Sequence, residues 1–172
     1  MATIALDVVT PSGRVFSAAT DELTLPAQAG DMGVLPGHLP IISGVRSGIV
    51  SCRVGSENKL FAIGRGFARV SETEVSLVVD DYLAKESVDP VQVRKELIEV
   101  NRELDGLMAK EMSGNDDADK LVKLTTRQNW LAVLLELHGD PAIATIQPKS
   151  DAGVGSTEVD EHAAAQDGSE AH

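Results

Sequence analysis

In the first half of the chain, hydrophobic residues alternate with polar ones, which is the two-residue period of a β-strand with one buried face. The alternation is clearest over residues 4–10, 22–26, 48–54, 59–64, 67–71 and 74–79. Glycine, proline and small polar residues separate these runs and supply the backbone angles that turns require. Many short strands with no helical pattern between them predict an antiparallel β-sandwich or a flattened barrel.

From about Tyr82 the hydrophobic period lengthens to that of an α-helix. The apolar positions that recur at steps of three and four are Val93, Leu97, Val100, Leu104 and Leu107. Asp89 followed by Pro90 is typical of a helix N-terminus. A second helical pattern ends at Gly139, and the short acidic segment SGNDDAD separates the two patterns. A connection this short predicts an antiparallel helical hairpin.

Residues 140–172 carry seven acidic residues and one lysine, with few large apolar groups. A segment of this composition cannot offset the entropy lost on ordering, so we expect a disordered acidic tail. The sequence therefore predicts three parts: a sandwich over residues 1–84, a hairpin over residues 85–139 and the tail over residues 140–172.

The chain is strongly acidic, with 27 acidic and 15 basic residues and a formal net charge of -12. This charge repels phosphate backbones and anionic lipid, which argues against nucleic acid or a membrane surface as a direct partner. No run of about 18 uncharged apolar residues indicates a membrane span. The single cysteine, Cys52, lies in an alternating run, which predicts a strand residue without a redox role.

No motif in the sequence predicts an enzyme, a cofactor site or a metal site. The segment GRGFAR, residues 64–69, lacks the ending of a phosphate-binding loop and predicts a strand bend with solvated arginines. The three aspartates of the SGNDDAD segment lack the glycine and the closing glutamate of a calcium loop, so we expect them at a helix N-terminus. Asp80 and Asp81 could form an acid–base pair. Neighbours in an extended chain point to opposite sides, however, which favours a solvated junction.

His38 lies in the segment GDMGVLPGHLP, where glycine and proline recur every few residues. It could act as a general base, with Asp31 or Asp7 as the only evident orienting acids. The alternative is a ring that hydrogen-bonds the local backbone and stabilises a tight turn. The absence of a nearby nucleophile in the sequence favours the alternative.

Three segments in this order resemble the epsilon subunit of bacterial F-type ATP synthases: DVVTPSGRVFS, GDMGVLPGHLPIISGVRSGIV and FAIGRGFARVSETEVSLVVDD. The resemblance covers about residues 3–138. It implies a ten-stranded β-sandwich followed by an α-helical hairpin, in agreement with the periodicity. It also implies a non-catalytic rotor subunit on the cytoplasmic face of the bacterial inner membrane, which touches the membrane only through the c-ring.

The resemblance implies partners and docking residues as well. In the family, the sandwich binds the gamma shaft and rests on the ring of c subunits. Asp31 matches a position where an acidic side chain faces the polar loops of that ring. The turn around His38 is expected at the same end of the sandwich, so that the implied docking residues are Asp31, Gly33, Pro36, Gly37 and His38.

In the family, the hairpin either folds against the sandwich or extends into the catalytic head, where it inhibits ATP hydrolysis. The basic residues of the second helix that would face the acidic alpha and beta subunits are Lys120, Lys123 and Arg127. Some members bind ATP through a motif of the form I/L-D-x-x-R-A. Here the matching stretch starts VDPVQV, with Asp89 retained but Gln92 and Val93 in place of the arginine and alanine, so no ATP site is expected.

Two other functions stay open at this point. The chain could be a free-standing sandwich that binds a small molecule, such as an adenine nucleotide, under a helical lid. It could also be an enzyme that uses His38. The resemblance favours the rotor subunit, and the periodicity agrees with the fold that the resemblance implies.

Overall fold

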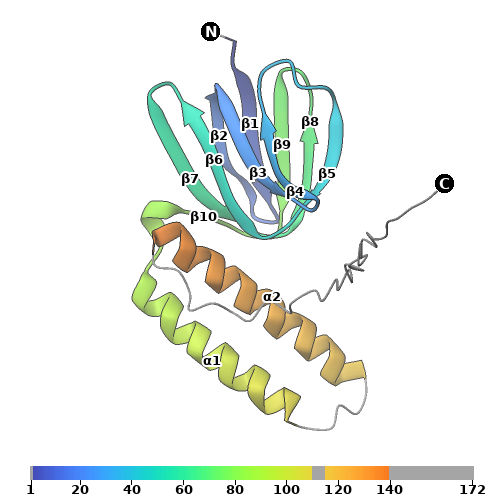
Figure 1. The fold of residues 1–172 in the computed structure, drawn as a ribbon, viewed down its shortest axis with the longest axis vertical. Helices are drawn as coiled ribbons and strands as arrows, with labels where there is room; N and C mark the ends of the chain where they lie inside the picture. The colour runs from blue at the N-terminus through green and yellow to red at the C-terminus, as the bar shows by residue number, and fades with distance from the viewer. Residues whose placement is uncertain (1, 110–114, 140–172) are drawn as a thin grey trace, which may run out of the picture.

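The computed structural model describes residues 2–109 and 115–139, which form ten β-strands followed by two α-helices (Figure 1). This confirms the predicted sandwich and helical hairpin. The acidic tail falls outside the described residues, as does the start of the SGNDDAD segment.

The strands are β1 (Ile4–Thr10), β2 (Gly13–Thr20), β3 (Glu22–Ala27), β4 (Gly30–Val34), β5 (Ile41–Val45), β6 (Gly48–Val54), β7 (Glu57–Ile63), β8 (Gly66–Val70), β9 (Glu74–Val79) and β10 (Tyr82–Ala84). A short 3₁₀ turn, Lys85–Ser87, leads to the helices α1 (Pro90–Met108) and α2 (Asn115–His138).

The strands pair in the order β10-β7-β6-β3-β5-β8-β9-β1-β2, with β4 paired to β3 beside this path. All pairs are antiparallel except β1 with β9, which run parallel. The edges of the sheet, at β2 and at β7 with β10, approach each other through three aromatic rings. Phe16 of β2 lies 4.9 Å from Phe61 of β7, and Phe61 lies 5.3 Å from Tyr82 of β10, between ring centroids.

Two hydrophobic clusters hold the molecule together. The first lies inside the sandwich and consists of alternate residues of nearly every strand, among them the fully buried Leu6, Leu25 and Leu77. The second joins α1 and α2 to the outer side of β6 and β7, where Ile49, Leu60 and Ala62 meet the helices. The hairpin therefore folds against the sandwich, with α2 as the helix that contacts the strands (Figure 1).

Helix α1 begins where the sequence predicts, and its predicted apolar residues lie on the buried side. Asp89 is the N-cap of α1, and its Oδ1 accepts hydrogen bonds from the backbone N–H groups of Val91 and Gln92 at 3.0 and 3.1 Å. The apolar stripe of α1 packs on α2. The buried residues of α2 are Trp130, Leu131, Leu134, Leu135 and Leu137.

The structure adds detail at two element boundaries. The period changes at about Tyr82, but residues 82–84 pair with β7 as a tenth strand, and α1 begins at Pro90, as the Asp89–Pro90 pattern predicts. The aspartates of the SGNDDAD segment lie at the N-terminus of the second helix as expected, although α2 begins earlier, at Asn115, so that Asp116 and Asp117 are in its first turn. Acidic side chains in the first turn of a helix still interact favourably with its dipole.

Candidate docking surfaces

The loop between β4 and β5 is tied to the β8–β9 turn. The N–H of Gly37 donates to the carbonyl of Glu72 at 2.8 Å, and Gly37 has a φ of 84°, which glycine adopts without strain. His38 is half-buried, and its Nδ1 lies 2.8 Å from the carbonyl oxygen of Leu39. Because a carbonyl only accepts, Nδ1 must carry the proton. His38 thus hydrogen-bonds the local backbone, as the sequence favoured, and Pro36 lies in the same loop.

Asp31 lies at the start of β4, beside the β3–β4 turn. Its carboxylate accepts a hydrogen bond from Nη2 of Arg46 at 2.7 Å, and both side chains are more than half exposed. Arg46 comes from the β5–β6 turn, which places a cation and an anion side by side at this corner. Gly33 is exposed in the middle of β4.

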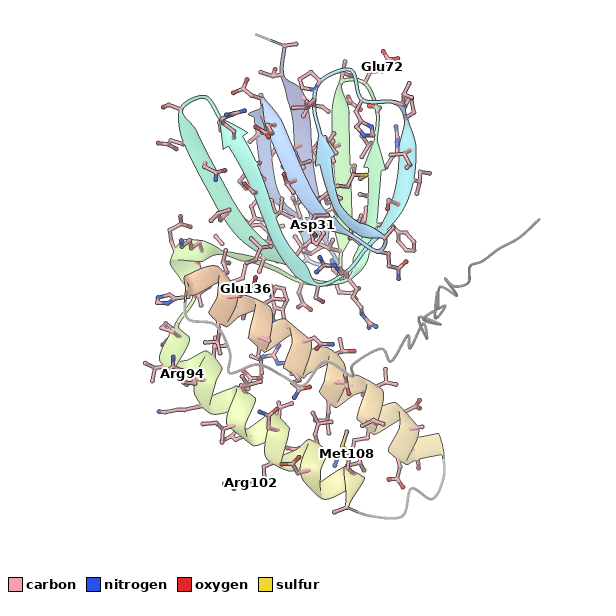
Figure 2. The ribbon with its side chains drawn as sticks, in the orientation of Figure 1. Asp31, Glu72, Arg94, Arg102, Met108 and Glu136 are labelled. Carbon is pink, nitrogen blue, oxygen red and sulfur yellow. The ribbon has the colours of Figure 1, made fainter. Side chains whose placement is uncertain are left out.

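Asp31 and His38 lie at opposite ends of the sandwich, which corrects the expectation that they share one end. Asp31 pairs with Pro26 next to the β3–β4 turn, whereas His38 follows the other end of β4, next to Gly37, whose N–H donates to the carbonyl of Glu72. Figure 2 shows the labelled Asp31 on the side of the helices and Glu72 at the far end. The reason is that residues 30–34 form a strand, which carries the chain from one end to the other. Asp31 and His38 therefore belong to different ends of the sandwich surface.

An apolar strip runs across the outer face of β5, β8 and β9. Ile42, Phe67 and Val78 are exposed by 73%, 63% and 55%. Phe67 is the direct cross-strand partner of Val78, and Ile42 pairs with Arg69, two residues further along β8. Sequence reasoning missed this strip. Its signal was present in β9, where Val78 breaks the alternation by standing on the polar side of the strand.

The second surface feature is an open cleft of about 250 Å³ between α2 and the sandwich. It is lined by Arg65, Asp81, Val122, Lys123, Thr126, Arg127 and Trp130. Arg65 comes from the β7–β8 turn and Asp81 from the segment before β10, so one wall is sandwich and the other is α2. Two of the three basic residues expected to dock a partner, Lys123 and Arg127, lie here, and Lys120 is exposed one turn away.

Polar contacts tie the two helices together near this cleft. Arg127 of α2 forms an ion pair with Glu96 of α1, with Nη2 to Oε1 at 2.6 Å. Nε2 of Gln128 donates to Oδ1 of Asn101 at 2.7 Å. The charge of Arg127 is thus partly neutralised by Glu96 within the hairpin.

The residues at the degenerate ATP motif have structural roles. Asp89 caps α1, Val93 is buried in the second hydrophobic cluster, and Gln92 is exposed. Within residues 2–109 and 115–139, no group of three or more histidine, cysteine or acidic residues could hold a metal ion. Neither described helix is long and apolar enough to cross a membrane.

Cys52 is buried in β6, as expected for a strand residue. Burial raises the pKa of its thiol, and the positive charge of Lys59 opposes that shift. Burial likewise raises the pKa of Tyr82, with smaller contributions from Glu86 and Cys52. Asp80, Asp81 and the arginines of residues 64–69 are exposed, so the strand bend and the solvated junction are found where the sequence predicts them.

Comparison with known proteins gives the same family at the level of domain and chain. The model of the family described as ATP synthase, Delta/Epsilon chain, beta-sandwich domain matches residues 3–85. An ATP synthase epsilon chain of Magnetococcus marinus is 38% identical over 104 residues, which are 60% of this chain and 76% of that relative. One of Francisella tularensis subsp. holarctica is 32% identical over 116 residues, 67% of this chain and 74% of that relative.

The fold is also found in solved ATP synthase structures. A chain of the Euglena gracilis mitochondrial ATP synthase has a TM-score of 0.64 at 20% identity, and the match covers 79% of this chain and 81% of that one. A chain from the central stalk and c-ring of the Tetrahymena thermophila mitochondrial ATP synthase has a TM-score of 0.53 at 11% identity, covering 78% and 96%. At these identities the likeness concerns the fold.

Proposed function

We infer a function for this chain from one premise: it belongs to the family of ATP synthase epsilon chains. The chain is a non-catalytic subunit of the central stalk of an F-type ATP synthase. Its proposed partners are the gamma subunit, the c-subunit ring and the alpha and beta catalytic subunits. It transmits the rotation of the c-ring to the catalytic head and has no turnover of its own. Its association with the membrane is that of the complex, and we place it on the cytoplasmic face of a bacterial inner membrane.

The observation that supports a docking role best is the apolar strip of Ile42, Phe67 and Val78. Large apolar side chains gathered on one face of a strongly acidic chain are typical of a protein–protein interface. The loop at His38 borders the strip, because Ile42 is the second residue of β5, which begins where that loop ends. We assign this combined face to the gamma subunit.

The opposite end of the sandwich, with Asp31 and Arg46, is assigned to the c-ring. The paired side chains offer a carboxylate acceptor and guanidinium donors to polar loops. Exposed ion pairs contribute about 0–1 kcal/mol, so breaking this one in favour of contacts with the ring costs little. The two partners thus bind at two places on the sandwich rather than at one.

We propose that the hairpin restrains ATP hydrolysis in the extended position. The stripe that contains Leu131, Leu134 and Leu135 is buried against α1 and the sandwich in the folded position. Extension needs another apolar partner to replace these contacts, which makes the hairpin a two-state element. In the extended position Lys120, Lys123 and Arg127 would face acidic surfaces of the catalytic subunits.

The interface is tested by measuring binding to the gamma subunit after Phe67→Glu and Ile42→Asp. Both side chains are exposed, so the fold should persist while affinity falls at least about tenfold, which corresponds to about 1.4 kcal/mol. The matched control is Val91→Asp, another change of an exposed apolar residue to an acid, which lies on α1. Unchanged binding of gamma by the strip variants would contradict this assignment.

The regulatory role is tested by ATP hydrolysis of the catalytic complex with three versions of the chain. These are the full chain, a chain ending at Gly139 and a chain ending at Ser87, which keeps β10. Hydrolysis should rise only when the helices are absent, because the brake is assigned to α1 and α2. Equal rates with all three chains would refute inhibition by the hairpin.

A further inference from the structure

The cleft between α2 and the sandwich gathers cations in an otherwise acidic chain. Arg65 and Lys123 face it from opposite walls, and in the part of the chain that the structure describes neither forms an ion pair with an acid. Arg127 adds a third positive charge, although Glu96 partly neutralises it. Asp81 is the one acidic residue that lines the cleft. The lining therefore carries three basic residues against one acid.

The floor of the cleft is partly apolar. Val122 is 58% exposed, and Trp130, a buried member of the second hydrophobic cluster, also lines the cleft. Cations above an apolar floor suit an acidic peptide with an interspersed apolar residue better than a small inorganic anion. A peptide can bury apolar surface while its carboxylates pair with the basic groups.

We propose that the occupant is a segment of this chain's own acidic tail, centred on Glu158, Asp160 and Glu161. These three acids fall within four consecutive residues, with Val159 among them. The tail as a whole has seven acids and one lysine over residues 140–172, so its charge is opposite to that of the cleft. The proposal rests on the cleft and the tail alone and does not depend on the role in the central stalk.

The length of the tail suits this contact. From Gly139 back to Lys123 is sixteen positions of helix, or about 24 Å at 1.5 Å per residue. From Gly139 forward to Glu158 is nineteen positions, and a flexible chain of that length has a root-mean-square span of about 24 Å. Effective concentration is highest when the span and the linker length agree, and it reaches about the millimolar range for short flexible linkers. Individually weak ion pairs are sufficient under such conditions.

The contact would favour one position of the hairpin. Since one wall of the cleft is sandwich and the other is α2, a segment bound to both is bound only while α2 lies on the sandwich. A ligand that binds one of two states shifts the equilibrium towards it. The bound tail would also neutralise Lys123 and Arg127, so that these side chains are not available to other acidic surfaces.

The test uses the full chain with a nitroxide label at Thr157→Cys, next to the acidic segment. Cys52 is 1% exposed and does not compete for the reagent under native conditions. Paramagnetic line broadening should concentrate on the backbone amides of Arg65 and of Val122 to Trp130. Raising the salt concentration from about 0.1 M to 1 M shortens the screening length from about 10 to 3 Å and should reduce the broadening by at least about half.

Charge reversal supplies the matched variants. Lys123→Glu should reduce the broadening at the cleft by at least about twofold, whereas the control Lys95→Glu, an exposed lysine of α1 outside the cleft, should not. Neutralising the segment with Glu158→Gln, Asp160→Asn and Glu161→Gln together should have the effect of Lys123→Glu. Broadening that is absent, spread evenly over the surface or centred on another basic region would overturn the proposal. So would broadening at the cleft that persists unchanged at 1 M salt.

Discussion

Gly66 lies where β8 passes closest to β9. A Cβ placed on Gly66 would lie 2.0 Å from the carbonyl oxygen of Val78, and that oxygen belongs to the backbone and cannot rotate away. The glycine is needed here for space. At Gly33, in β4, an added Cβ would meet nothing within 4 Å.

Gly66→Ala should therefore destabilise the sandwich by about 2–4 kcal/mol, because β8 and β9 must separate to make room. Gly33→Ala, the matched control, should change the free energy of unfolding by less than about 0.5 kcal/mol. Urea unfolding followed by circular dichroism measures both. Equal stability of the two variants would contradict the close approach.

Cys52 offers a second prediction at this scale. Its thiol has a raised pKa in the folded state, so the unfolded chain loses the thiol proton first as the pH rises. The folded state then binds more protons, and the free energy of unfolding falls with pH above about 8.5, where an exposed thiol ionises. The contribution is present below that pH and is lost as the pH rises through the folded pKa.

Alkylation of Cys52 by a thiol reagent at pH 9 should accordingly be at least about 100-fold slower in the folded chain than in urea. An exposed thiol introduced by Ser56→Cys, in the β6–β7 turn, should react at the unfolded rate in both conditions. Rapid alkylation of native Cys52 would show that β6 opens far more readily than its burial suggests. The Cys52→Ala variant should weaken the alkaline fall in stability.

The role of His38 could be predicted from its own neighbours, since the glycines and prolines around it mark a turn and a turn offers backbone carbonyls. The relation between His38 and Asp31 could not. Residues 30–34 contain two glycines and little alternation, so nothing local identifies them as a strand. Pairing with β3 decides it, and this pairing separates the two side chains.

At the scale of elements, α1 depends on its cap. Two backbone N–H groups at its start donate to Asp89, and Pro90 removes a third donor that would otherwise be unsatisfied. Asp89→Ala should destabilise α1 by about 1 kcal/mol, whereas Asp89→Asn, which caps equally well, should be nearly neutral. Amide hydrogen exchange in the first turn of α1 is the measurement. Equal exchange in both variants would mean that tertiary packing alone holds this end.

Periodicity predicted the long elements and missed the short ones. The helices repeat their apolar positions over several turns, so their existence was clear from the sequence. β10 spans three residues, Tyr82–Ala84, which is too short for a period to be recognised. It forms because its backbone pairs with the edge of β7. The sequence of residues 82–84 does not indicate that this edge is available.

At the scale of the whole molecule, one hydrophobic cluster stabilises the sandwich and the other holds the helices on it. The first consists of sandwich residues only, so a chain ending at Ser87 should keep its strands and unfold cooperatively. Its midpoint temperature should be lower than that of the full chain, because removal of the helices exposes Ile49, Leu60 and Leu83. Circular dichroism, together with a dye that binds exposed apolar surface, checks both statements. Loss of all strand signal would show that the helices are needed for the sandwich to fold.

The parallel pair of β1 and β9 has a consequence for synthesis. Ala5 pairs with Glu74, so the first strand obtains its second neighbour only when almost the whole sandwich has left the ribosome. At about 5–20 residues per second, this wait is on the order of several seconds. Contacts so distant in sequence also slow refolding of the complete chain. During translation, Ile4, Leu6 and Val8 stay exposed to solvent or to a chaperone, although each is fully buried in the finished subunit.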